Sequence, residues 1–372
     1  MASFFRYRDE RIAIGIVERL KRLLSGHLRF MHVCGTHQDT IVRFGLDIML
    51  KEAGIEVIPG PGCPVCVTTP YEIEIAVNLA NNGKIIATFG DMFRVKGVKS
   101  SLADARASGA SVFIVYSVSD AIAIASEHKK KDVVFFSIGF ETTAPATASA
   151  VLNGVPENFS ILSAHRLIPP AMSALIEMGE MRIDGFINPG HVSSIIGVGA
   201  YEHISKRYGV PQVIAGFEPI DVMYAVYMLV SQIMRGEACV ENEYRRVVRY
   251  DGNKKAREVM NAVFRAVDVA WRGFPVIKSS GLQLKRTYED KDALKRYEDE
   301  IDEIEQNLTE LMEKQSSEAT CRCGDVLRGI ISPAECPLFG RACSPHRPIG
   351  PCMVSREGSC NILYRYRKSG RL

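Results

Sequence analysis

The chain has 372 residues, of which 47% are hydrophobic, and its formal net charge is only +3. This length predicts two or three domains, and the small net charge argues against binding of nucleic acid or of an anionic membrane surface. The longest apolar stretch, 222–234, is shorter than the roughly 20 residues that a membrane span needs, and the N-terminus does not resemble a signal peptide, so we expect a cytoplasmic protein.

Strands and helices alternate through the first 240 residues. Runs rich in β-branched and aromatic residues predict strands at 29–34, 55–60, 84–89, 111–116, 132–139, 159–164, 184–189 and 211–216. Apolar strands alternating with helices indicate parallel sheets covered on both faces. The spacing favours two doubly wound parallel-sheet α/β domains, 1–124 and 125–240, facing a cleft. One closed barrel is the alternative.

Polar and thiol side chains follow many of these strands. They are Cys34, Cys63, Asp91, Glu141, His165, His191 and Glu218. Ligands of open α/β sheets bind at the carboxyl ends of the strands, so we expect these residues to gather there. For Asp91, Glu141 and His191 two interpretations stand side by side: they act in a site, or they make polar contacts that stabilise loops.

Two early segments carry cysteines in chemically suggestive settings. In "CGTH" (34–37) a histidine follows Cys34 closely enough to favour its thiolate, which predicts a metal ligand or a nucleophile. A buried, inert thiol is the third possibility. In "GPGCPVC" (60–66), Cys63 and Cys66 lie between a strand and a helix, which fits thiol–disulfide exchange or soft-metal binding. Cys239 stands alone and is interpreted as structural.

The last region, 241–372, is predicted to hold an amphipathic helical linker (285–318) and a small cysteine-rich domain. Most of the ten cysteines crowd between 321 and 360, with irregular spacing and without a Cys-x₂-Cys knuckle. In a reducing compartment this pattern fits a four-cysteine iron–sulfur cluster better than zinc or disulfides alone. The most even ligand set is Cys323, Cys336, Cys343 and Cys360. Cys321 and Cys352 are left to form a disulfide or to lie free beside the cluster.

Several long motifs occur in order and carry a family resemblance. They are "CGTHQ" (34–38), "GPGCPVC" (60–66), "FGDMFRV" (89–95), "GFETTAP" (139–145), "NPGHVS" (188–193), "GFEPID" (216–221), "CPLFGRAC" (336–343) and "MVSREGSC" (353–360). Together they resemble the HypD family of hydrogenase maturation proteins. The resemblance implies two α/β domains facing a cleft, a third domain with a [4Fe–4S] cluster, and a role in building the Fe(CN)₂CO group of [NiFe]-hydrogenases. It also implies HypC and HypE as partners, and the hydrogenase large subunit as an indirect one.

The resemblance further implies roles for matching residues. Cys34 would bind a transient iron ion in the complex with HypC, supported by Thr36 and His37. Cys63 and Cys66 would supply redox equivalents or receive cyanide. The cluster would be held by Cys323, Cys336, Cys343 and Cys360, with a shift between Cys321 and Cys323 left open. His191, Glu141 and Asp91 would bind the cyanide nitrogen or supply protons.

These assignments lead to a mechanistic hypothesis. Taking cyanide from a thiocyanate carrier needs two electrons, which a dithiol at Cys63 and Cys66 would supply to the iron at Cys34 and recover through the cluster. Two alternatives remain at this point. One is an iron–sulfur-dependent thiol–disulfide oxidoreductase that acts on a protein substrate. The other is a passive scaffold that binds partners and catalyses nothing.

Overall fold

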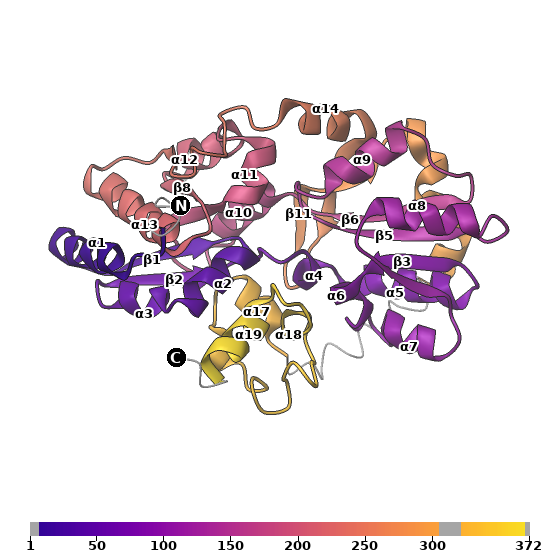
Figure 1. Ribbon diagram of the computed structural model, residues 1–372, viewed down its shortest axis with the longest axis horizontal. Coiled ribbons are helices and arrows are strands. Elements are labelled where there is room, and N and C mark those ends of the chain that lie inside the picture. Colours follow the sequence, from indigo (N-terminus) through magenta and orange to yellow (C-terminus); the bar gives the residue numbers. More distant parts are fainter. Residues whose placement is uncertain (1–6, 305–320, 369–372) are drawn as a thin grey trace.

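The fold consists of two open parallel sheets, each flanked by helices, and a cysteine-rich C-terminal region between them (Figure 1). The computed structural model describes residues 7–304 and 321–368. The α/β class with two parallel sheets is therefore confirmed, and the alternative of one closed barrel is wrong.

The first sheet has five parallel strands in the order β2-β1-β7-β8-β9. The strands are β1 (Leu28–His32), β2 (Ile55–Pro59), β7 (Gly185–Pro189), β8 (Gln212–Ala215) and β9 (Val240–Asn242). The helices of this half are α1 (Glu10–Leu23), α2 (Gly35–Arg43), α3 (Leu46–Lys51), α11 (Gly190–Ile196), α12 (Glu202–Tyr208) and α13 (Pro219–Met234). Every residue of β7 and β8 is buried, as expected for strands covered on both faces.

The second sheet has four parallel strands in the order β4-β3-β5-β6. They are β3 (Ile85–Phe89), β4 (Val112–Val115), β5 (Val133–Gly139) and β6 (Phe159–His165). Its helices are α5 (Pro70–Asn81), α6 (Gly90–Phe93), α7 (Leu102–Ala107), α8 (Val118–Glu127), α9 (Ala144–Leu152) and α10 (Ile168–Met178). Helix α5 begins at a capping box in which the Thr69 and Glu72 side chains satisfy each other's backbone N–H groups.

The chain does not fill the two sheets in the order that the sequence suggested. The four-stranded sheet runs from β3 to β6, so the expected break at 124/125 falls inside it, between β4 and β5. The five-stranded sheet starts with β1 and β2, and the chain returns to it only at β7. Strand alternation alone does not reveal such a return, because both sheets are built from the same kind of apolar strand.

A hairpin and a helix occupy the region expected to be only a linker. Helix α14 (Lys254–Val263) leads into the antiparallel strands β10 (Phe264–Ala270) and β11 (Val276–Leu284). The hairpin joins the second sheet where the Leu167 N–H donates to the Ser280 carbonyl over 2.8 Å. The described part of the predicted helix 285–318 is not one continuous helix: it consists of a 3₁₀ helix (Arg286–Lys291), α15 (Ala293–Arg296) and a further helical stretch over 298–304. Its later part, 305–318, lies outside the described residues.

The cysteine-rich segment has little regular structure and docks against both halves. Its short helices are α17 (Cys323–Leu327), α18 (Pro351–Val354) and α19 (Ser359–Leu363). Helix α19 packs on α2, while α17 and α18 pack on α4 (Pro64–Val67), the turn that contains Cys66. Ion pairs from Arg365 to Asp39 and from Arg367 to Asp47 fasten its end to the first half.

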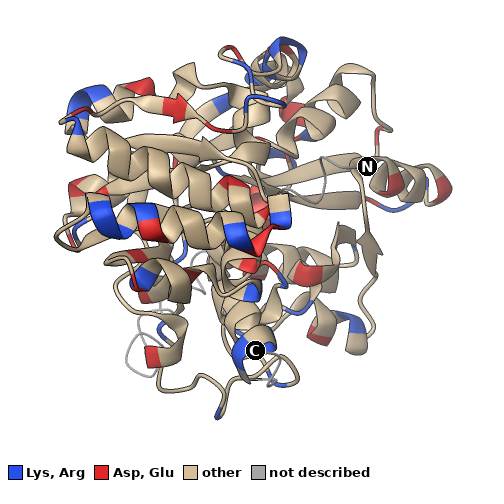
Figure 2. Ribbon diagram, turned by 60° about the vertical axis from the view of Figure 1, so that its left-hand side comes forward, with Lys and Arg blue, Asp and Glu red and all other residues tan. Residues whose placement is uncertain are grey.

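Positively and negatively charged side chains are mixed over the surface. Lys and Arg residues are interspersed with Asp and Glu over the helices rather than gathered in one patch (Figure 2). Among residues 7–304 and 321–368, no helix has both the length and the apolar character that a membrane crossing requires.

Candidate functional site

Cys34 lies where β1 ends and α2 begins. The residue is in extended conformation and precedes the first turn of α2. Its backbone packs against Gly62, in the segment that follows β2. The contact is so close that a Cβ at position 62 would lie 2.1 Å from the Cys34 nitrogen. Glycine is therefore required in "GPGC" so that the two strand ends, and the cysteines that follow them, can approach each other.

The Cys34 thiol is buried, which favours its protonated form. Burial raises its pKa to about 11, although the backbone N–H groups of Thr36 and His37 oppose this effect by hydrogen bonding to the sulfur. These amides would stabilise a thiolate once a cation displaces the proton, since metal binding and thiol deprotonation are coupled. Thr36 thus contacts the sulfur, as its place in "CGTH" suggested.

The His37 ring does not pair with the thiol as the sequence suggested. Its Nε2 lies 2.9 Å from the carbonyl oxygen of Gly216, at the end of β8, and no hydrogen bond to Cys34 is seen for the ring in the described structure. Burial lowers the His37 pKa to about 4, so the imidazole is neutral and Nε2–H donates to that carbonyl. The first turn of α2 directs the ring toward β8 rather than back over the sulfur.

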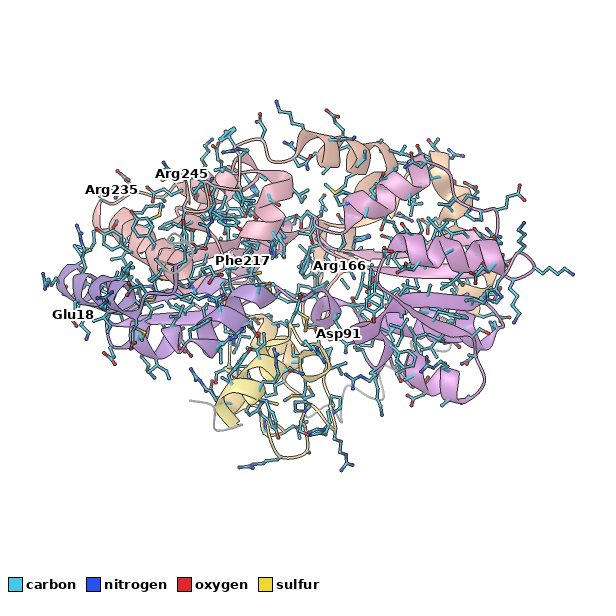
Figure 3. The ribbon with its side chains drawn as sticks, viewed as in Figure 1. Glu18, Asp91, Arg166, Phe217, Arg235 and Arg245 are labelled. Carbon is cyan, nitrogen blue, oxygen red and sulfur yellow. A yellow bond between two sulfur atoms is a disulfide. The ribbon has the colours of Figure 1, made fainter. Side chains whose placement is uncertain are left out.

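Phe217 joins the two histidines of the site. Its ring stacks on His191 at 3.9 Å between centroids and lies 5.0 Å from His37. In Figure 3 Phe217 lies near the middle of the molecule, between the two sheets. The "GFEP" and "NPGHVS" motifs therefore meet at this aromatic contact. Phe217 was not identified from the sequence, because an aromatic residue after a strand usually belongs to the core.

Cys63 and Cys66 form a disulfide at the start of α4, with their Cα atoms 5.3 Å apart. Both are almost fully buried. They line a small cavity together with Cys34, Cys352 and Glu357. The pair predicted to be redox-active and the predicted iron ligand thus share one cavity, and the C-terminal segment closes it.

Glu141 is buried at the end of β5. Its Oε1 accepts a hydrogen bond of 2.9 Å from the Ile168 N–H, while Oε2 has no partner among the described residues. The buried Tyr201 hydroxyl, 3.1 Å from Ser193 Oγ, interacts electrostatically with both Glu141 and Cys34. Tyr201 therefore links the "GFETT" and "NPGHVS" motifs to the thiol, and nothing in its local sequence indicated this.

The Glu141 carboxyl makes stability depend on pH. Burial raises its pKa from 4.5 to about 7, so its contribution is fully present below the unfolded pKa and is lost as pH rises through 7. At about 1.4 kcal/mol per pKa unit this amounts to roughly 3 kcal/mol. Urea unfolding at pH 5 and pH 8 should show a larger loss of stability for the unmodified chain than for Glu141→Gln. Equal losses would contradict this assignment. The pKa of Glu243 is also raised to about 7, but this residue is present in both proteins. Its contribution to the loss of stability is therefore the same in both and does not affect the comparison.

Asp91 has a docking role in the structure. Its Oδ2 accepts hydrogen bonds from Ser355 Oγ at 3.0 Å and from the Arg356 N–H at 3.1 Å. The next residue, Glu357, packs against Gly35, lines the Cys34 cavity and interacts electrostatically with Cys34. Asp91 therefore fixes the segment that brings Glu357 to the thiol. Glu357 was not singled out from the sequence, since it follows no strand.

Removing the Asp91 carboxylate should loosen that segment. For Asp91→Ala we expect a loss of about 1 kcal/mol of stability, typical of a partly exposed hydrogen-bonded group. Amide hydrogen exchange at Arg356 should be faster, while the amides of β5 exchange as before. Unchanged protection at Arg356 would contradict the docking role. Asp120→Ala is the matched control, because Asp120 is a partly exposed N-terminal helix carboxylate in α8 that is remote from the cysteines.

The other strand-end residues have structural partners. His165 is buried, neutral and bonded through Nε2 to Ser137 Oγ at 2.9 Å. Glu218 caps α13 and forms an ion pair with Arg8. Cys239 is exposed; its N–H and thiol bond to Gln232, and its carbonyl accepts from the Gln212 N–H. These three do not join the Cys34 cavity.

A second cavity lies beside the first and is lined by cysteines. Its lining includes Cys321, Cys323, Cys336, Cys343, Cys352 and Cys360. The remaining lining is mainly apolar, with Val326, Phe339 and Met353, and the Ile349 N–H points at the Cys343 sulfur over 3.3 Å. Thiolates with backbone N–H donors in an apolar shell are the setting of a protein-bound iron–sulfur cluster. The donor set therefore fits a [4Fe–4S] group.

Cys352 has a different neighbour from the one expected. Its sulfur lies 2.9 Å from that of Cys323, not beside Cys321. Cys321 interacts electrostatically with Cys323 most strongly, and also with Cys336 and Cys360. The sulfurs of Cys323 and Cys352 thus form a close pair, while Cys352 also hydrogen-bonds to Cys360.

Neither cavity is arranged around a single metal ion. Within the ranges 7–304 and 321–368, no group of three His, Cys, Asp or Glu side chains converges as ligands of one ion would. This is compatible with a cluster, because each thiolate of such a site binds a different iron atom.

Comparison with known proteins assigns the chain to a family over almost its whole length. The model of the family HypD, described as "Hydrogenase formation hypA family", matches residues 11–367. A Methanocaldococcus jannaschii protein named for hydrogenase expression/formation is 46% identical over 344 residues, which cover 92% of both chains. The hydrogenase maturation factor HypD of Escherichia coli is 42% identical over 374 residues, covering 97% of both chains. HypD2 of Bradyrhizobium diazoefficiens is also 42% identical, covering 97% of this chain and 95% of its own.

Proposed function

The chain belongs to the HypD family of hydrogenase maturation factors, and from this we propose that it assembles the Fe(CN)₂CO group of [NiFe]-hydrogenases. In this proposal Cys34 holds the iron while cyanide is transferred to it. The iron and its diatomic ligands are the cargo, which passes onward to the hydrogenase large subunit.

One observation carries the proposal: two cysteine-lined cavities meet at Cys352. The first contains Cys34, Cys63 and Cys66, and the second contains the remaining C-terminal cysteines. A low-spin iron with cyanide and carbon monoxide ligands needs soft sulfur donors, and its assembly needs electrons. The two adjoining cavities supply sulfur donors, and their cysteines can exchange electrons by forming and breaking disulfides.

The cysteine-lined cavity is assigned to a [4Fe–4S] cluster. We propose Cys321, Cys336, Cys343 and Cys360 as its ligands, because Cys323 is engaged with Cys352. This replaces Cys323 in the ligand set that the spacing favoured. When bound, such a cluster supplies electrons one at a time. Cys352 lines this cavity and also the one that contains the Cys63–Cys66 disulfide.

Cys63 and Cys66 are proposed to act as the dithiol that releases cyanide. Reduced, they give two electrons and two protons and close to the observed disulfide. The carbon–sulfur bond of a thiocyanate carrier breaks, the carrier leaves as a thiol, and cyanide keeps the electron pair with which it binds iron. The second proton passes to the surroundings, where the Glu357 carboxyl lines the same cavity.

The partners follow from the ligands that the chain lacks. Cys34 is a single thiolate, so the iron requires further donors from a second protein, which we assign to the small partner HypC. The thiocyanate carrier is assigned to HypE. The cavity is closed by Glu357 and Ser359 of the C-terminal segment, so access of either partner requires this segment to shift.

Complementation tests this function. The chain, expressed in a bacterium that lacks its own HypD, should restore the activity of a [NiFe]-hydrogenase. Cys34→Ala should reduce that activity to the level without the chain, because this variant lacks the thiolate that holds the iron. Cys239→Ala should restore activity fully, since Cys239 is exposed and remote from both cavities. Full activity with Cys34→Ala would contradict the proposal.

Burial argues against the oxidoreductase alternative. Cys63 is 4% exposed and Cys66 is fully buried, so the disulfide of a folded protein substrate cannot reach them in this conformation. A cyanide-carrying side chain or chain end is much smaller, and it too reaches the sulfurs only when the C-terminal segment shifts.

A further inference from the structure

Arg272 is a cation at the junction of the two cysteine sites. It lies in the turn between β10 and β11, next to Trp271, which is buried and donates from Nε1 to Ser280 Oγ over 3.0 Å. The following residue, Gly273, has a φ of +80° and packs so closely on Gly324 that a Cβ would lie 2.3 Å from the Gly324 Cα. The turn between β10 and β11 is thus in close backbone contact with Gly324, the residue that follows Cys323.

The backbone and guanidinium of Arg272 hold the end of α4. Its N–H donates to the Val67 carbonyl over 2.8 Å, and Nε donates to the Thr68 carbonyl over 2.9 Å. Val67 directly follows Cys66. Arg272 therefore connects the segment of the Cys63–Cys66 disulfide to the cysteine-rich segment.

The charge of Arg272 faces sulfur rather than a carboxylate of its own. Its Nη2 is shielded from solvent and has no hydrogen-bond partner in the described parts of the chain. The charged or titratable groups that interact with it are Cys321, Cys323, Cys352 and Glu72. Glu72 is already paired with Arg166, whose Nη2 lies 2.7 Å from both carboxylate oxygens. This leaves the thiols as the groups that Arg272 can neutralise.

We propose that Arg272 is a positioning residue whose fixed positive charge raises the reduction potential of the cluster assigned to the cysteine-lined cavity. Reduction adds one electron, and hence one negative charge, without making or breaking a bond. A nearby cation in a poorly solvated site stabilises the more negative state. The inference rests on the proposed function, because it requires a cluster in this cavity.

The test is a potentiometric titration of the full chain, reconstituted anaerobically with iron and sulfide and reduced by dithionite. Arg272→Gln should make the equilibrium constant for reduction at least tenfold less favourable. For one electron this lowers the midpoint potential by about 59 mV. Arg272→Lys should stay within that margin of the unmodified chain. Arg265→Gln is the matched control, since Arg265 lies on the same hairpin but is exposed and bonds to Gln283.

The outcomes separate this inference from the function beneath it. An unmodified chain that takes up no cluster would contradict the proposed function. A loaded Arg272→Gln variant with an unchanged potential would overturn the role of Arg272, as would a lowered potential that Arg272→Lys does not restore. If Arg272→Gln fails to take up iron, the test rests on Arg272→Lys. This variant must bind the cluster with the midpoint potential of the unmodified chain, because it retains the positive charge without the bond to Thr68.

Discussion

Cys321→Ala should abolish the four-iron cluster, whereas Cys323→Ala should still take it up. Cys321 interacts with Cys336 and Cys360 across the cysteine-lined cavity, while the Cys323 sulfur is 2.9 Å from that of Cys352. A four-iron cluster that loses one of four thiolates is not held stably, so we expect the visible absorbance and the bound iron of Cys321→Ala to fall to background. Iron and sulfide analysis after anaerobic reconstitution measures this.

The two variants control for each other, because the two cysteines lie only two positions apart in the chain and both are replaced by alanine. The reverse result, with the cluster lost in Cys323→Ala and kept in Cys321→Ala, would restore the ligand set that spacing alone favoured. A loss in both variants would show that the Cys323/Cys352 pair is not separate from the cluster. Cys239→Ala should load normally in either case.

Cys63→Ser should leave iron bound but stop cyanide transfer. The serine cannot form the disulfide seen with Cys66, so no dithiol is available to give two electrons. Because Cys34 is untouched, iron in the complex with HypC should remain near the level of the unmodified chain. Hydrogenase activity in a complemented cell should fall to the level without the chain, measured alongside iron content.

This variant separates the three functions considered. A passive scaffold would support maturation with Cys63→Ser, which would contradict the redox role. An oxidoreductase acting on a protein substrate would reduce that substrate without HypC or HypE, and the buried position of both sulfurs predicts that it does not. Cys239→Ser, an exposed cysteine, is the matched control and should behave as the unmodified chain.

Local patterns predicted the elements well and the grouping of strands poorly. The strand around β5 could be recognised because most of its residues are apolar and β-branched or aromatic, and all of them are buried. The order β2-β1-β7-β8-β9 could not be recognised, because it depends on which strands meet after the chain has crossed to the second sheet and back. The β10–β11 hairpin was missed since its exposed residues weaken the apolar pattern.

The candidate site was predictable where a motif carries its own chemistry. Cys34, Cys63 and Cys66 are reactive side chains next to glycine or proline, and they share one cavity. Tyr201, Phe217, Glu357 and Arg272 were not predictable, because their roles arise from contacts between segments far apart in the chain. Spacing also favoured Cys323 over Cys321, since it contains no information on which sulfur faces Cys352.

Infrared spectroscopy of the purified complex with HypC tests the central claim most directly, because cyanide and carbon monoxide on iron absorb where proteins do not. The account predicts cyanide and carbonyl bands in the unmodified chain and in Cys239→Ala, and their absence in Cys34→Ala. Bands of unchanged intensity in Cys34→Ala would show that the iron is held elsewhere, and would contradict the assignment of Cys34 as its ligand.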